Sequence, residues 1–110
     1  MYDKNNIFAK IIRGEIPCKK ISETIHTMAF DDLRPQARIH ILVIPKGGYE
    51  NLPDFVENAT EAEKKDFWNM VISIADKADV RGNFRMVANT GVGAGQSVQH
   101  FHVHVMSGDL

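Results

Sequence analysis

Near the carboxyl end, in the segment Gln-His-Phe-His-Val-His-Val-Met over 99–106, the six residues 100–105 alternate between polar and apolar side chains. Side chains of a β-strand point alternately to its two faces, and neighbours on one face stand about 6.6 Å apart. The pattern predicts a strand with three histidines on one face and apolar residues on the other. Three of the five histidines share this register, which is an improbable accident. The strand therefore predicts a sheet with one face packed in the core and one face that presents the polar histidines.

The first half of the chain predicts a short helix followed by three strands. Apolar residues at 7, 8, 11 and 12 have helical spacing, with Asn5 or Asn6 as the cap and Gly14 at the end. Residues 39–44 are almost continuously apolar and β-branched, which is typical of a central strand and predicts a buried His40. The other two strands are expected at 21–25 and 27–30.

The second half predicts one long helix between strands. Thr60 and Glu63 match a capping box, and helical spacing continues to about Val80, with Gly82 just beyond. Residues 51–54 are expected to form a loop that opens a short helical turn. Further strands are expected at 84–89 and 99–106, joined by a glycine-rich connection at 91–95. This order favours an α+β fold with a mainly antiparallel five-stranded sheet and one long and one short helix.

The size and charge of the chain restrict its partners. Its 110 residues suit a single domain over 1–110, and pairing with a second copy would add buried area. The net charge of −1, without long runs of like charge, argues against nucleic acid. No apolar stretch approaches the roughly 18 residues of a membrane span. A single cysteine, Cys18, has no partner for a disulfide, so we expect a reduced thiol and a cytoplasmic protein.

Two kinds of chemistry are open to the histidine strand. Residues 91–97 offer unobstructed backbone N–H groups and the Ser97 hydroxyl just before it, an arrangement that can hold an anion but is a weak signal alone. Histidines at alternate positions of a strand can also hold zinc. No Glu or Cys follows nearby to complete a ligand set, although His40 or a distant acid could do so.

Several segments in order resemble one known family. Residues 100–106 match the His-φ-His-φ-His-φ-φ motif of the histidine triad (HIT) superfamily, in which φ is apolar. Residues 7–17, 29–33, 35–46 and 95–98 resemble the corresponding segments of its Hint branch of nucleoside phosphoramidases. This resemblance spans nearly the whole chain, and it implies a HIT-like fold and a nucleotidyl hydrolase.

The resemblance also implies roles for individual residues. His102 would attack the α-phosphorus of a purine nucleotide derivative and form a nucleotidyl-histidine. His104 and Ser97 would assist the leaving group, while His100 and His40 would orient the nucleophile. Asp32 would bind the ribose hydroxyls. The apolar base pocket would comprise Ile7, Phe8, Ile11, Ile16, Phe30 and Leu33, and the residues near the phosphate would be Asn89, Gly95 and Gln96.

The expected substrates are purine nucleoside 5′-phosphoramidates or aminoacyl adenylates, with release of AMP by a homodimer that needs no cofactor. Some bacterial relatives hold a structural zinc ion through a Cys-x-x-Cys pair and a histidine. The corresponding positions here are Asn6, Ala9 and Gly48, which predicts no zinc. The alternatives are a dinucleoside polyphosphate hydrolase, a purine nucleotide-binding regulatory module and a metal-binding module.

Overall fold

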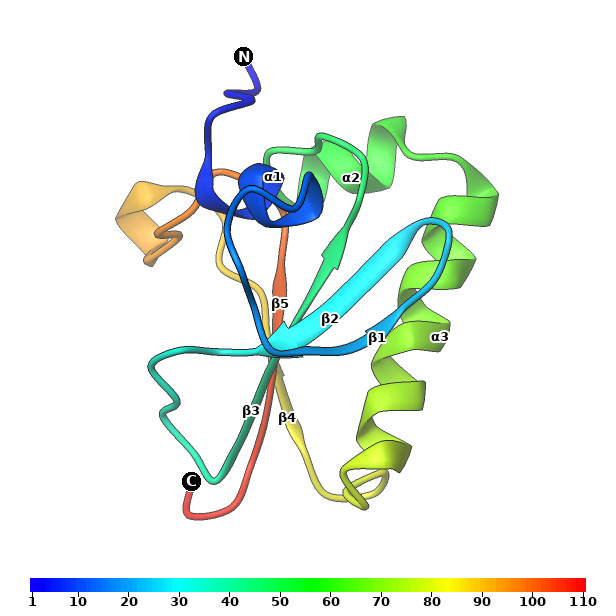
Figure 1. Ribbon diagram of the computed structural model, residues 1–110, viewed down its shortest axis with the longest axis vertical. Coiled ribbons are helices and arrows are strands. Elements are labelled where there is room, and N and C mark those ends of the chain that lie inside the picture. Colours follow the sequence, from blue (N-terminus) through cyan, green and yellow to red (C-terminus); the bar gives the residue numbers. More distant parts are fainter.

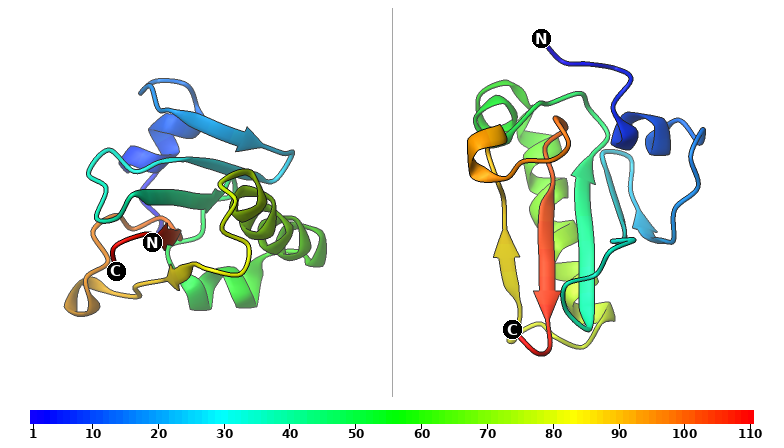
Figure 2. Two further views of the ribbon diagram at one scale, coloured as in Figure 1. Left: turned by 90° about the horizontal axis from the view of Figure 1, so that it is seen from below. Right: turned by 90° about the vertical axis from the view of Figure 1, so that its left-hand side faces the viewer.

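A computed structural model describes residues 1–110. Its centre is an antiparallel sheet of five strands in the order β1-β2-β3-β5-β4, and helices lie on both faces (Figures 1 and 2). The strands are β1 Lys20–Glu23, β2 Thr27–Asp31, β3 Ile39–Pro45, β4 Arg85–Val87 and β5 Val103–Ser107. The helices are α1 Ile7–Ile12, α2 Leu52–Asn58, α3 Glu61–Lys77 and the short 3-10 helix η1 Val92–Ala94.

The predicted α+β fold and antiparallel sheet are confirmed, but the helix count is not. The segment expected to open one helical turn forms the complete helix α2, capped by the side chain of Asn51, so there are two short helices beside the long one. Helix α3 has the predicted capping box between Thr60 and Glu63. It ends earlier than expected, because Asp79 takes the left-handed conformation with φ of 58°. Asp adopts this conformation more readily than most residues, so Gly82 was the wrong stop signal.

The last strand is shorter than its sequence pattern. Regular pairing of β5 with β3 ends at the pair Val43 and Val103, so residues 99–102 of the predicted strand lie outside the observed β5. There the backbone N–H of Phe101 bonds instead to the carbonyl of Tyr49, beyond the end of β3. The alternation of faces nevertheless continues through this segment, because Phe101 packs in the core with Val103.

The two faces of the sheet carry separate apolar clusters. Residues from β2, β3 and β5 pack with α2 and α3 into a cluster of twelve buried side chains on one face. On the other face, six buried side chains from α1, β2 and β3 form a second cluster. Figure 2 shows α1 and α3 on opposite sides of the sheet. None of the helices combines the length and apolar character that a membrane crossing requires.

Candidate active site

The triad histidines lie on the α1 face of the sheet. His100 is completely buried, His102 is 4% exposed and His104 is half-buried. The ring of Phe8, from α1, packs edge to face against both buried imidazoles, with its centroid 5.0 Å from that of His102 and 6.2 Å from that of His100. The polar face of the predicted strand is therefore covered by protein at its first two histidines.

Backbone carbonyls determine which ring nitrogens carry protons. Nδ1 of His102 lies 2.8 Å from the carbonyl oxygen of His100, and Nε2 of His100 lies 2.8 Å from that of Pro45. A carbonyl oxygen only accepts hydrogen bonds, so each of these nitrogens must donate a proton. In neutral His102 the lone pair is therefore on Nε2, where a nucleophile needs it.

Burial keeps these rings neutral. Loss of hydration lowers the pKa of His102, and it lowers the pKa of His100 to about 4. The carbonyl of His100 opposes this effect by accepting the proton on Nδ1 of His102. At neutral pH the Nε2 lone pair of His102 is available.

His104 belongs to a second chain of hydrogen bonds. The backbone N–H of Gln36 donates to Nδ1 of His40 over 3.0 Å, so neutral His40 carries its proton on Nε2. That nitrogen lies 2.9 Å from Nδ1 of His104 and 3.3 Å from Oδ2 of Asp32. His104 then accepts at Nδ1 and carries its own proton on Nε2. Burial lowers the pKa of His104 to about 4.

Asp32, His40 and His104 form a cluster of potential metal ligands. Ligand atoms of Asp32, His40 and His104 lie within 4.8 Å of one another. A metal ion would need the lone pair of Nε2 of His40, but this nitrogen is protonated because Nδ1 accepts from Gln36. The arrangement therefore suits a hydrogen-bond chain better than a metal centre.

A cavity of about 440 Å³ opens beside α1. Eight of the residues that the sequence assigned to the site line it: Ile7, Phe8, Ile11, Ile16, Phe30, Asp32, Leu33 and Ser97. The lining residues that sequence reasoning missed are Pro17, Cys18, Asp31, Arg34, Leu42 and Val98. The cavity wall is mostly apolar, with Asp32 and Ser97 among its polar groups. All of the expected base and ribose residues therefore come together around one cavity.

The residues expected near the phosphate lie outside the wall of this cavity. Gln96 is buried, and its side-chain amide bonds within the protein: it accepts from the N–H of Gly91 and donates to the carbonyls of Glu50 and Val98. The Gln96 side chain thus stabilises this loop through hydrogen bonds within the protein. Gly95 has φ of 92° next to the side chain of Asn89.

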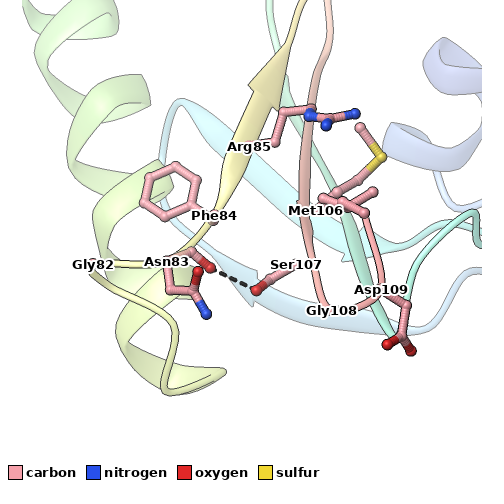
Figure 3. A pocket seen from close by; sticks show the side chains of 9 residues that line it. Gly82, Asn83, Phe84, Arg85, Met106, Ser107, Gly108 and Asp109 are labelled. Atoms are coloured by element: carbon pink, nitrogen blue, oxygen red, sulfur yellow. Dashed lines mark hydrogen bonds between the residues drawn. The ribbon is translucent and has the colours of Figure 1, made fainter.

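The two larger of the four other hollows adjoin the sheet. One of about 300 Å³ shares Asp31, Asp32 and Leu33 with the α1 cavity and is also lined by His40. The other, of about 450 Å³, lies between the connection before β4 and the end of β5, where the Ser107 hydroxyl donates to the carbonyl of Asn83 (Figure 3). None of the predicted site residues lines this second hollow.

Two groups that orient the histidines escaped the sequence analysis. The backbone N–H of Gln36 sets the tautomer of His40, although the resemblance covered this segment. Tyr2, whose hydroxyl contacts His100, lies outside every motif. The contact spans 98 positions, so no local pattern could have indicated it.

Comparison with known proteins agrees with this fold. The HIT domain family model matches residues 13–110. An uncharacterised 13.2 kDa HIT-like protein of Azospirillum brasilense is 50% identical over 108 residues, covering 97% of this chain and 88% of its own. The crystal structure of a HIT family hydrolase from Legionella pneumophila is similar with a TM-score of 0.88 and 33% identity, over 96% of this chain and 95% of that one.

The histidine triad nucleotide-binding protein of Candida albicans has a TM-score of 0.85 and 32% identity, over 96% of this chain and 76% of its own. The fold and the histidine-containing site thus define a histidine triad protein. The chain belongs to the HIT family.

Proposed function

We propose that this HIT domain, over 1–110, is a nucleotidyl hydrolase of the Hint type. Its substrates are purine nucleoside 5′-phosphoramidates or aminoacyl adenylates, and AMP is released through a nucleotidyl-histidine on His102. The observation that carries this proposal is the hydrogen bond from Nδ1 of His102 to the carbonyl of His100, which leaves the Nε2 lone pair free. Relatives described as a hydrolase and as a nucleotide-binding protein support it.

In the first step, Nε2 of His102 forms a bond to the α-phosphorus while the bond from phosphorus to the leaving group breaks. The imidazole then becomes cationic, and its Nδ1–H bond to the His100 carbonyl stabilises that charge. The leaving amine takes the proton from Nε2 of His104 as the bond to phosphorus breaks, and the Ser97 hydroxyl donates a hydrogen bond to it. Water then attacks phosphorus and gives a proton back to His104, while the bond between phosphorus and Nε2 of His102 breaks, so AMP is released and His102 returns to its neutral form.

The cavity beside α1 would hold the nucleotide. Its apolar wall suits a purine base, and the Asp32 carboxylate at its edge suits the two ribose hydroxyls. In this proposal the phosphate lies next to the segment that contains Asn89, Gly95 and Gln96. No step needs a metal ion or another cofactor, because hydrogen-bond donors offset the phosphoryl charge.

A side-by-side assay tests this proposal. Adenosine 5′-phosphoramidate and diadenosine tetraphosphate are offered to the wild type, to His102→Ala and to His26→Ala, in which the histidine removed lies outside the site. We expect faster hydrolysis of the phosphoramidate, its loss in His102→Ala and wild-type rates in His26→Ala. Faster hydrolysis of the tetraphosphate would favour the dinucleoside polyphosphate alternative.

Trapping of the intermediate tests the mechanism separately. Adenosine phosphoramidate carrying ³²P at its α-phosphorus is mixed with enzyme and quenched in alkali, where a phosphorus bond to histidine survives. We expect label on the wild type and none on His102→Ala. Tight nucleotide binding without label or turnover would favour a regulatory binding module.

We propose a cytoplasmic homodimer whose two sheets join edge to edge. Strand β4 lies at an edge of the sheet, so one side of its backbone is free to pair with another strand. Met86 in β4 is 46% exposed, and Trp68 on α3 is 40% exposed. Light scattering should give the mass of a dimer for the wild type and that of a monomer for Val87→Pro, while a wild-type monomer would contradict the proposal.

A further inference from the structure

Tyr2 contacts the first histidine of the triad. Its hydroxyl oxygen lies 2.6 Å from Nδ1 of His100, and the two rings pack edge to face with centroids 5.6 Å apart. The proton of His100 is on Nε2, where the carbonyl of Pro45 accepts it. Nδ1 therefore carries the lone pair, and the Tyr2 hydroxyl is the donor.

The Tyr2 ring is packed closely against the turn that follows β3. A Cβ atom at Gly48 would lie between 2.8 and 3.1 Å from three atoms of this ring. Any side chain at position 48 would therefore push the ring away. Glycine at this position permits the approach that brings the hydroxyl to His100.

His100 depends on this contact because it is completely buried. Both of its ring nitrogens have partners, one in Tyr2 and one in Pro45. Without the hydroxyl, Nδ1 would be a buried acceptor with no donor, which is unfavourable. The ring is thus fixed at both ends, and the carbonyl of the same residue accepts the Nδ1–H of His102.

We infer that Tyr2 is a positioning residue for the nucleophile: by holding the ring of His100, it fixes the carbonyl that orients His102. It touches neither the cavity nor the reacting atoms. Its effect on rate depends on the function proposed above, whereas its effect on the two histidines does not.

Tyr2→Phe removes only the hydroxyl group. The matched control is Tyr49→Phe, because the Tyr49 hydroxyl donates to Glu63 while its ring packs on the α3 face. Rates with adenosine phosphoramidate are compared at a temperature at which each variant is fully folded. We expect kcat of Tyr2→Phe to fall about tenfold, the effect of one hydrogen bond, with KM unchanged within about twofold. Tyr49→Phe should keep both constants.

¹⁵N NMR of the imidazole rings provides a readout that needs no substrate. In the wild type, His100 should show a hydrogen-bonded, unprotonated Nδ1, and His102 should show a protonated Nδ1. In Tyr2→Phe the His100 Nδ1 signal should move toward that of a free lone pair, and His102 should become a mixture of tautomers. Gly48→Ala should shift the same signals with Tyr2 intact, because it displaces the ring.

Two results would overturn the inference. One is an unchanged His102 tautomer in both Tyr2→Phe and Gly48→Ala, and the other is an equal fall of kcat in Tyr2→Phe and Tyr49→Phe. A wild type that hydrolyses no nucleotide, together with a His102 tautomer that shifts in Tyr2→Phe, would uphold the positioning role and refute the proposed function.

Discussion

One face of the sheet is covered by α2 and the 17-residue α3, whereas the other is covered by the six-residue α1. The α3 face buries twelve apolar residues in one cluster, and the α1 face buries six. Beside α1 lies the cavity of about 440 Å³. The same strands thus provide a packed core on one side and a binding cavity on the other, because one helix is too short to cover its face.

Polar groups are also distributed unequally between the faces. The imidazoles of His100 and His102 are on the α1 face with Phe8, while Phe101 stacks with Phe55 on the α3 face. Every buried polar side-chain atom has a hydrogen-bond partner. The α1 face can therefore bury two histidines at little cost, because carbonyls and the Tyr2 hydroxyl satisfy every nitrogen of their rings except Nε2 of His102. Neighbouring residues of one segment should accordingly differ in whether they affect activity or stability.

The largest effect is expected from His102→Ala, compared with Phe101→Leu. Loss of the nucleophile should lower kcat/KM about 10⁴-fold. Phe101→Leu should leave the rate within about threefold but lower the free energy of unfolding by about 1–2 kcal/mol, because it opens space in the core. Steady-state kinetics and urea unfolding of both variants would measure this. A comparable loss of rate in fully folded Phe101→Leu would contradict the division between the faces.

A smaller effect is expected at the edge of the cavity. Asp32→Asn should lower kcat/KM for adenosine phosphoramidate about 10- to 100-fold, because hydrogen bonds to a charged group contribute about 1.5–3 kcal/mol. The loss should shrink with the 2′-deoxy substrate, which lacks one of the hydroxyls. Asp31→Asn is the control, since its side chain is exposed beside the same cavity. An equal loss with both substrates would show that Asp32 does not bind the ribose.

The sequence predicted which residues belong to which face and left the contacts between distant segments undetermined. The alternation of 99–106 and the apolar run of 39–44 reflect periodicity, which depends only on local geometry. The carbonyl partners of His100 and His102 depend on how the chain turns after β3, and no periodicity contains that information. Tyr2 shows the same limit, because the segment before α1 has no pattern that points toward His100.

Element ends were also poorly determined by the sequence. The β5 pattern begins at residue 99, but regular strand pairing begins at Val103, and before it the N–H of Phe101 bonds to the carbonyl of Tyr49 beyond β3. Likewise α3 ends at Lys77, shortly before Asp79, which adopts the conformation usually assigned to glycine. Pairing partners and the conformational tolerance of single residues decide such ends.

Acid should destabilise the protein through the buried histidines of the α1 face. The pKa of His100 and that of His104 are lowered by burial to about 4, from a usual value of 6.5. Unfolded chains therefore bind more protons than folded ones between these values, so stability is complete above about pH 6.5 and falls as pH decreases toward 4. Urea unfolding at pH 7.5, 6 and 5 should show this fall. His104→Asn should make this fall of stability with pH shallower. An unchanged slope in that variant would show that His104 does not contribute to the fall.

The smallest effect is expected from two exposed isoleucines, one on each side of the sheet. Ile7 on α1 lines the cavity and is 44% exposed, while Ile72 on α3 is 39% exposed. Ile7→Ala should raise KM for adenosine phosphoramidate about three- to fivefold, because apolar area that would contact the base is lost. Ile72→Ala should leave KM unchanged. Both should alter the free energy of unfolding by less than about 1 kcal/mol, since neither side chain is buried. An equal rise of KM in both variants would show that the cavity beside α1 is not where the base binds.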